Sequence, residues 1–461
     1  MSQISINLDP VRGARDFFPN DLLVRDWLFN IWRRVSRSFA YQEYDAPILE
    51  PADLWDKKSG SDILNEMYSF EKEGIQYTLR PEMTPTLTRM MMSCHKSITM
   101  PARWFSLPQC WRFESTARGR KREFYQWNVD MFGASPIRSE VELFSMLVQF
   151  LKAVNHTHDD VTIRVSDRRL LQKICTLFGV PDDKFNKTVN LIDKMGKLPR
   201  PELTQLLKDE VNLSDEQVDQ LYQIVQIKDI NEMKTYLGDD DPVIEEINKI
   251  FSICKELSLD SWMELDLSVV RGLSYYTGMV FEGFFKNSEL KRAIFGGGRY
   301  DNLMASYGSD PLPAIGFGMG DVVIMDVLNE RGLVPKLTHN LSYIVIPFND
   351  EMFPIAVSIS NKMRELTTYN VETYNGNTRL RVALDYANRV QANNVIIVAP
   401  DEWKNQQIVL KPMRGGLQRT LGLNEFIREL TRPVRVPMYT VNSEDVMGIS
   451  DSDHGSYGSN N

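Results

Sequence analysis

Residues 110–130 read CWRFESTARGRKREFYQWNVD, which we interpret as two antiparallel strands joined by a basic loop. Successive side chains of a strand point to opposite faces, so Arg112 and Glu114 share one face of the first strand. The residues expected on one face of the second strand are Phe124, Gln126 and Asp130. The loop 118–122 is a candidate phosphate-binding loop, although a solvated hairpin tip would explain the same basic composition.

Three glycine-rich segments follow this hairpin. They read RGLSYYTG at residues 271–278, FGGGRYD at 295–301 and GFGMG at 316–320. Adjacent glycines suit a place where a ligand lies against the main chain, although structural turns explain most glycine runs. In a strand, Gly316 and Gly318 would clear one face for a flat ligand such as adenine. No segment satisfies Gly-x-Gly-x-x-Gly and no Walker loop is present, which disfavours dinucleotide-binding and P-loop proteins.

The composition is that of a folded chain of several domains, because 461 residues include 43% apolar and 25% charged residues. The longest apolar runs fall far below the ~20 residues that span a membrane, so we predict no membrane association. The four cysteines form no Cys-x-x-Cys pair, and His156 and His158 occupy a polar segment. We therefore predict no metal site, a surface position for both histidines, and a cytoplasmic location without a targeting segment.

Periodicity divides the chain into segments of different structure. A helix is predicted over residues 21–40, short strands follow up to Pro136, and helical periodicity then dominates before strands return. The net charge is −9, but the last strand–helix module carries a small excess of basic residues. The predicted parts are a first domain of residues 1–169 and 256–335, a helical insertion of 170–255, a C-terminal α/β domain of 341–440, and a disordered tail of 441–461.

These motifs, in this order, resemble a known family. Arg112-Phe-Glu114 with its loop and Phe124 resembles motif 2 of class II aminoacyl-tRNA synthetases, and segments 271–278 and 295–301 resemble the two histidine-specific motifs of histidyl-tRNA synthetases. Pro47 is similar to the motif 1 proline at that family's dimer interface. The resemblance implies an α+β fold: a class II antiparallel sheet flanked by helices, a helical insertion, and a C-terminal α/β anticodon-binding domain.

The resemblance also implies an activity and its partners. The enzyme would activate L-histidine with ATP, accompanied by Mg²⁺, to histidyl-adenylate and transfer histidine to the 3′ end of tRNA(His) as a homodimer. Two anions must meet at the α-phosphate, where fixed positive charge is needed, and Arg112 and Arg271 would supply it from opposite sides as catalytic residues. Arg120 and Arg122 would contact the outer phosphates, and Glu114 would lie near the adenine amino group.

The implied histidine pocket joins acceptors for an ammonium group to partners for an imidazole ring. Glu82, Thr84 and Gln126 match the family's contacts to the α-ammonium group. Asp130 and Tyr276 match its contacts to the two ring nitrogens, and Tyr300 lines the same pocket. An amino acid of similar size without those nitrogens would leave buried polar groups unpaired, at a cost of about 1 to 3 kcal/mol each.

One segment departs from the family pattern. Motif 3 of most class II enzymes ends with an arginine after its glycines, but Gly320 is followed by Asp-Val-Val-Ile, and no arginine lies between Arg299 and Arg331. We expect Arg299 or the basic loop to compensate. Two other functions remain open: a regulatory subunit of ATP phosphoribosyltransferase, which usually lacks the C-terminal module, and a synthetase-like sensor of uncharged tRNA, for which a kinase segment is missing.

Overall fold

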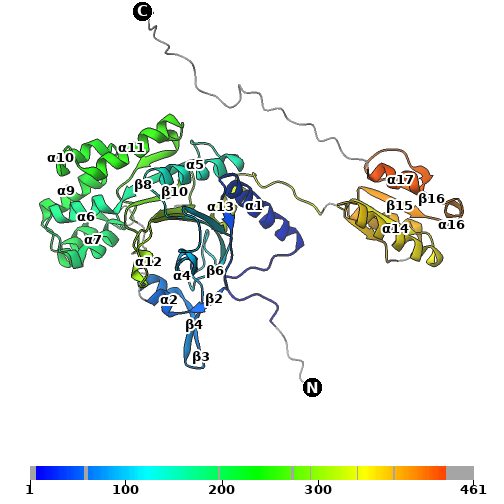
Figure 1. Ribbon diagram of the computed structural model, residues 1–461, viewed down its shortest axis with the longest axis horizontal. Coiled ribbons are helices and arrows are strands. Elements are labelled where there is room, and N and C mark those ends of the chain that lie inside the picture. Colours follow the sequence, from blue (N-terminus) through cyan, green and yellow to red (C-terminus); the bar gives the residue numbers. More distant parts are fainter. Residues whose placement is uncertain are drawn as a thin grey trace, which may run out of the picture. The chain divides into compact units, whose positions relative to one another are not determined.

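The computed structural model describes residues 7–56, 61–195, 198–270, 275–290, 292–339, 341–376 and 379–431. The chain forms two compact units, Met1–Leu337 and Thr338–Asn461 (Figure 1). Two predictions fall outside the described residues: the position of Arg271, and the disorder of the tail 441–461.

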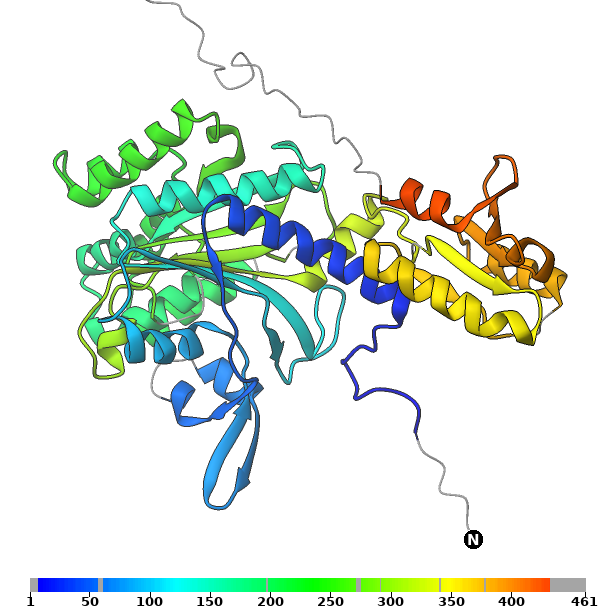
Figure 2. The ribbon, with the colours of Figure 1, turned by 45° about the vertical axis from the view of Figure 1, so that its right-hand side comes forward.

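The first unit is built on one large sheet whose central pairs are antiparallel, as predicted (Figure 2). Its order is β1 (Gln42–Glu43), β5 (Ala102–Ser106), β7 (Glu123–Phe132), β12 (Ala314–Gly320), β11 (Phe295–Arg299), β10 (Met279–Phe285), β8 (Val161–Asp167) and β9 (Met263–Leu265), with β6 (Gln109–Trp111) on β7. Among the described strands of this sheet, only the outer pairs β1–β5 and β8–β9 are parallel. The glycines of 316–320 therefore lie in mid-sheet, in β12.

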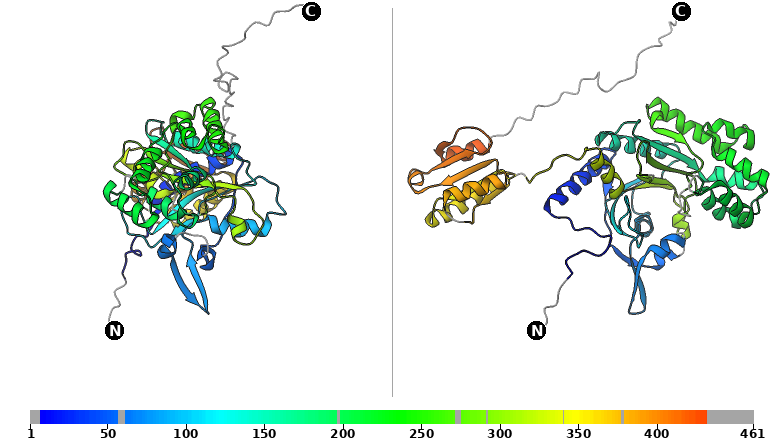
Figure 3. Two further views of the ribbon diagram at one scale, coloured as in Figure 1. Left: turned by 90° about the vertical axis from the view of Figure 1, so that its left-hand side faces the viewer. Right: turned by 180° about the vertical axis from the view of Figure 1, so that it is seen from behind.

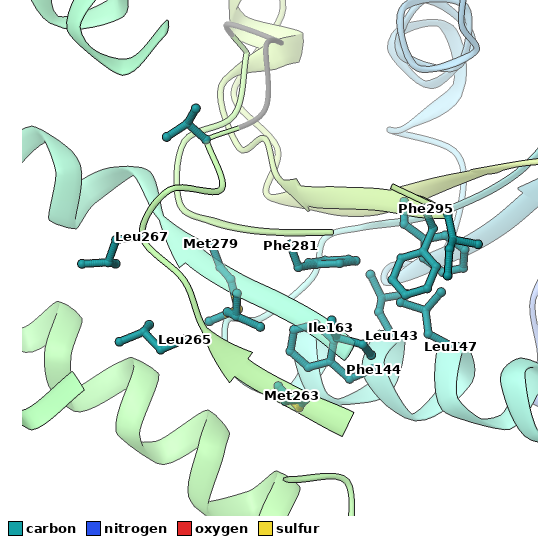
Figure 4. Close-up of a cluster of buried hydrophobic side chains, with 14 of the residues drawn as sticks. Leu143, Phe144, Leu147, Ile163, Met263, Leu265, Leu267, Met279, Phe281 and Phe295 are labelled. Carbon is teal, nitrogen blue, oxygen red and sulfur yellow. The ribbon is translucent and has the colours of Figure 1, made fainter. Parts of the chain in front are cut away.

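Three helices cover one face of this sheet, and residues 84–94 and 303–306 pack on part of the other face. The helices α1 (Pro19–Ser38), α5 (Arg138–Ala153) and α13 (Asp321–Glu330) bury their apolar sides in a core shared with β7, β8, β10 and β12. Trp127 stacks on Trp32, and Phe144 meets Phe281 edge-on with ring centres 5.0 Å apart (Figure 4). Because strand side chains alternate, inward Trp127 leaves its neighbour Gln126 on the opposite face.

Helices occupy most of the predicted insertion, between β8 and β9 (Figure 1, green). They are α6 (Arg168–Leu177), α7 (Phe185–Ile192), α8 (Arg200–Leu206), α9 (Asp215–Val225), α10 (Lys234–Leu237) and α11 (Pro242–Glu256). Capping residues define two of the helix starts: Ser214 and Gln217 form a capping box on α9, and the Asp241 carboxylate accepts from the amides of Val243 and Ile244 on α11.

A smaller sheet and short helices complete the first unit (Figure 3). The sheet has the order β2 (Leu49–Pro51), β4 (Ile75–Leu79) and β3 (Tyr68–Lys72), and the helices are α2 (Asp53–Asp56), α3 (Ser61–Glu66), α4 (Thr84–Cys94) and α12 (Leu303–Ser306).

The surface prediction for His156 is wrong. Its side chain is buried edge-on against Phe285, and burial lowers its pKa.

The C-terminal unit is an α/β layer structure with helices on both sheet faces. Its strand order is β14 (Val371–Thr373), β13 (Tyr343–Pro347), β15 (Asn394–Val398), β16 (Gln407–Pro412) and β17 (Arg419–Gly422). The helices are α14 (Phe353–Leu366), α15 (Leu380–Arg389), α16 (Pro400–Trp403) and α17 (Leu423–Leu430). Val345 and Ile396 pack with α14 and α17, whereas Ile344 and Val395 pack with α15. Continuous apolar strands fit a sheet buried on both faces.

Candidate active site

Two cavities open on the sheet face opposite α1, α5 and α13. The inner cavity has a volume of about 50 Å³ and is lined by Glu82, Thr84, Arg112, Gln126, Asn128, Asp130, Tyr275, Tyr276, Gly296, Tyr300, Gly316, Phe317 and Gly318. The outer cavity has a volume of about 830 Å³, and its lining includes Arg112, Glu114, Gly119, Arg120, Lys121, Phe124, Gln126, Glu282, Arg292, Gly320, Val322 and Val323. Arg112 and Gln126 line both, so the cavities adjoin at these two side chains.

Most residues selected from the sequence come together here. All six predicted histidine contacts line the inner cavity, and the predicted nucleotide contacts Arg112, Glu114 and Arg120 line the outer one. The structure does not bring Arg122 into either cavity. Its guanidinium lies 4.0 Å from the centre of the Phe113 ring, and its Nε donates to the Glu114 carbonyl. Arg122 thus helps to fix the base of the basic loop.

Asp130 places one unsatisfied carboxylate oxygen in the inner cavity. The Tyr300 hydroxyl donates to its Oδ1 at 2.5 Å, while Oδ2 is buried without a hydrogen-bond partner among the described residues. Burial raises the pKa of Asp130 to about 7, Glu82 adds to the rise, and the Tyr300 hydrogen bond opposes it. A buried acceptor of this kind fits a ligand that brings its own N–H group.

Glycine in β12 makes room for this carboxylate. Gly316 pairs with Asp130 across the sheet, and a Cβ at Gly316 would lie 2.1 Å from Asp130 Oδ1 and 2.6 Å from the Val129 carbonyl oxygen. No side chain larger than hydrogen fits there. Two residues along, a Cβ at Gly318 would meet nothing closer than 3.6 Å, so Gly318 keeps a cavity floor open instead of avoiding a clash.

Glu82 forms the opposite polar wall of the inner cavity. It is buried just before α4, and its Oε2 accepts from the Tyr275 hydroxyl at 3.1 Å. Tyr275 is a site residue that the sequence reasoning missed, because it selected the adjacent Tyr276. Both tyrosines line the cavity, and their ring centres are 4.9 Å apart. The pairing of two tyrosines within segment 271–278 is the sequence signal that points to Tyr275.

Arg112 is held at the junction between the cavities. Its Nε donates to the Pro81 carbonyl at 2.9 Å, and its guanidinium lies 5.4 Å from the centre of the Phe124 ring. Glu114 lies 3.8 Å from Arg112 and 2.8 Å from Arg120 Nε. The outer cavity is therefore lined by several cations, of which Arg112 lies over the flat ring of Phe124, an arrangement suited to a polyanion that carries an aromatic base.

The expected compensation by Arg299 is wrong. Its side chain is 3% exposed and points to the helix-covered face, where it binds Glu140, Ser139 and Asp301. Asp321, which follows Gly320, also has a structural role, because it pairs with Arg15 at 2.9 Å and accepts from the Tyr125 amide. Neither Arg299 nor Asp321 lines the outer cavity.

Comparison with known proteins agrees with this arrangement. A family model described as histidyl-tRNA synthetase matches residues 13–320, and an anticodon-binding domain model matches residues 342–432. The chain belongs to the histidyl-tRNA synthetase family. The general activity of this family is the two-step charging of tRNA with histidine at the expense of ATP. The predicted α+β fold with its C-terminal anticodon-binding domain is confirmed.

Individual relatives of this family match along most of their length. The chain is 37% identical over 422 residues to the chloroplastic/mitochondrial histidine–tRNA ligase of Arabidopsis thaliana, covering 91% of this chain and 86% of the relative. It is 32% identical to the histidine–tRNA ligase of Haloarcula marismortui, covering 92% and 98%. The crystal structure of histidyl-tRNA synthetase from Nostoc sp. PCC 7120 superposes with a TM-score of 0.74 at 20% identity, covering 92% of this chain and 99% of that one.

Two classes of feature are missing from the described part of the chain. No helix there combines the length and apolar character needed to cross a bilayer. No group of three or more histidine, cysteine or acidic side chains there is arranged to hold a metal ion.

Proposed function

We propose that the inner cavity binds L-histidine, the outer cavity binds ATP, and histidyl-adenylate forms where they adjoin. The observation that carries this proposal is that Arg112 lines both cavities. In adenylate formation the amino acid carboxylate attacks the α-phosphate of ATP, and a fixed guanidinium at that point offsets the charge that the two anions bring together. Arg271 would act from the other side, as its sequence motif implies.

In the inner cavity, Asp130 would select histidine. Its unpartnered Oδ2 would accept from an imidazole N–H, and Tyr276 would meet the other ring nitrogen. Glu82, Thr84 and Gln126 offer oxygen acceptors for the α-ammonium group. An amino acid lacking ring nitrogens would leave the buried Asp130 carboxylate unpaired, which is the physical source of discrimination.

In the outer cavity, adenine would lie on Phe124, with Glu114 near its amino group and Arg120 on the outer phosphates. Gly316 and Gly318, which the sequence assigns to ATP, line the inner cavity instead. Mg²⁺ would accompany ATP and neutralise phosphate charge. It commonly binds through one or two carboxylates plus phosphate oxygens, and Glu282 is a carboxylate that lines this cavity. The residues present thus fit a nucleotide-bound Mg²⁺ better than a protein-only site.

The remaining parts would serve tRNA(His). The domains are proposed as 1–169 with 256–335 for catalysis, 170–255 as an insertion toward the acceptor arm, and 341–440 for the anticodon, whose unstacked bases suit protein recognition. A homodimer is proposed because Pro47, with the half-exposed Leu49, lies near an open sheet edge. A cytoplasmic location is supported by four free cysteines. Light scattering and imaging of a tagged full-length chain would test these two points.

The central test is histidine-dependent exchange of labelled pyrophosphate into ATP, assayed with each amino acid separately. We expect exchange with histidine alone, and a fall of roughly 10²- to 10³-fold in Arg112→Ala because a fixed charge at the reacting phosphate is lost. Exposed Arg34 on α1 provides a matched control, and Arg34→Ala should retain exchange. Histidine-independent exchange, or none, would refute the proposal.

A second test separates the two units. Deleting residues from 341 onward should spare exchange, because both cavities are lined entirely by the first unit, and should impair charging of tRNA(His). Unchanged charging would refute the anticodon assignment. Exchange without a contribution from the deleted unit would also argue against a purely regulatory protein.

A further inference from the structure

Arg292 is a cation in the outer cavity that takes part in none of the ion pairs described above for the site. It lies just before β11, is half-buried, and lines the cavity. No described residue forms an ion pair or hydrogen bond with its guanidinium group. Glu114 and Arg120 act on it electrostatically, and Glu114 is already paired with Arg120 at 2.8 Å. The acidic residues Asp193, Glu282 and Glu289 line the same cavity. A half-buried guanidinium held near a second cation is well placed to receive a ligand.

Sheet order places Phe124 and Arg292 on opposite sides of β12. Gly320 on β12 pairs with Gln126 on β7, and the neighbouring Met319 pairs with Phe295 on β11. Phe124 lies on β7 and Arg292 lies three residues before the start of β11, so the two side chains reach the outer cavity from the two flanks of β12. The strands β7 and β11 are two strand spacings apart, about 10 Å, which leaves room for a flat ring between side chains from the two flanks.

The helix after β12 offers no cation at this place. Val323 Cγ2 lies 3.4 Å, and Arg292 Cδ 3.1 Å, from the point where a Cβ on Gly119 would stand, so the Arg292 stem runs beside Val323 under the basic loop. Val322 and Val323 make the end wall of the cavity apolar. Arg292 is therefore a planar cation that lines the outer cavity beside Val323, where the helix has none.

We propose that the Arg292 guanidinium stacks on the face of the adenine ring opposite Phe124. This inference rests on the proposed function, because it assumes that the outer cavity holds ATP. A guanidinium is planar and weakly hydrated, so it can cover an aromatic face, which the point charge of a lysine does less well. Arg292 would then be a nucleotide-binding residue supplied by the β10–β11 connection and not by α13.

The test uses the full-length chain and three variants. In Arg292→Ala we expect the KM for ATP in histidine-dependent exchange to rise about tenfold, with the KM for histidine unchanged, because one face of the base is uncovered. Arg292→Lys should restore little of this loss. Lys286, an exposed cation in the same β10–β11 connection that does not line the cavity, is the matched control, and Lys286→Ala should bind ATP as the parent does.

Calorimetric titration with ATP and with AMP separates base from phosphate contacts. Stacking on adenine predicts the same fold loss for both nucleotides in Arg292→Ala. A loss confined to ATP and rescued by Arg292→Lys would overturn the proposal in favour of a phosphate contact, and unchanged binding of both would overturn it entirely. If the parent protein shows no exchange, the proposed function is refuted instead. The direct titrations with ATP and AMP would still test the role of Arg292 in binding the nucleotide.

Discussion

The substitution Asp130→Asn tests two effects of the inner-cavity carboxylate. One is the free energy that its buried charge costs the folded protein, and the other is its proposed role in binding histidine. Burial raises the pKa of Asp130 from 3.8 to about 7, and the groups that face it are Tyr300, Glu82 and Tyr44. In the unfolded chain the carboxyl group loses its proton near its ordinary pKa. Between these two values the folded protein binds more protons than the unfolded one, so the contribution of Asp130 to stability falls as pH rises from about 4 to about 7 and stays low above that.

The size of this effect follows from the shift. About three pKa units at about 1.4 kcal/mol each give an upper limit of about 4 kcal/mol of stability lost above pH 7. Asparagine has the same shape, can accept from the Tyr300 hydroxyl, and carries no charge to bury. The variant should therefore exceed the parent in stability at pH 8, by a few kcal/mol at most, and the advantage should shrink toward pH 5.

The assay is urea unfolding of the full-length chain at pH 5, 6, 7 and 8, followed by tryptophan fluorescence, because Trp127 lies on the same strand as Asp130. The exposed Asp310, whose side chain is 82% accessible, gives a control variant Asp310→Asn. Added histidine should raise the unfolding midpoint of the parent but not of Asp130→Asn. A variant advantage that does not grow with pH would refute the buried-charge reasoning.

Close contacts give two further predictions. Gly316→Ala should abolish histidine-dependent exchange, because the new methyl group would stand 2.1 Å from Asp130 Oδ1; full activity in that variant would contradict the pairing of β12 with β7. Arg15→Met should lower stability by roughly 3 to 5 kcal/mol by leaving buried Asp321 and Glu123 without their shared cation, measured as a drop in the urea midpoint; a loss below about 1 kcal/mol would contradict it.

Local patterns predict the elements that depend on local physics. Helix starts at Ser214 and Asp241 follow from capping chemistry within four residues, and the strand bearing Gln126 and Asp130 follows from its alternation. The site is accessible to prediction for a different reason. The resemblance of its motifs to those of histidyl-tRNA synthetases selects Asp130 and Tyr300 without knowledge of the hydrogen bond between them, and alternation along β7 places Gln126 and Asp130 on one face.

The errors concern contacts between residues far apart in the chain. Arg299 and Tyr300 are adjacent and face opposite sides of β11, and only the strand pairing shows that Arg299 meets Glu140 under the helices. Polar neighbours suggest a surface position for His156, but Phe285 covers it from a distant strand. No local sequence pattern selects Arg292, because its proposed role in nucleotide binding depends on where β12 lies relative to Phe124.

The segment after Gly320 is ordered by ion pairs and hydrogen bonds of Asp321, although it lacks the arginine of the family pattern. Asp321 pairs with Arg15 and receives the Tyr125 amide, so the start of α13 is tied to the N-terminal segment and to β7. The same N-terminal segment accepts the Arg122 amide at the Gly13 carbonyl, which fixes the base of the basic loop. An arginine on α13 is then not needed to order these elements. On the proposal that Arg292 supplies the nucleotide cation from the β10–β11 connection, ATP affinity should respond to changes in that connection and not to the charge of α13.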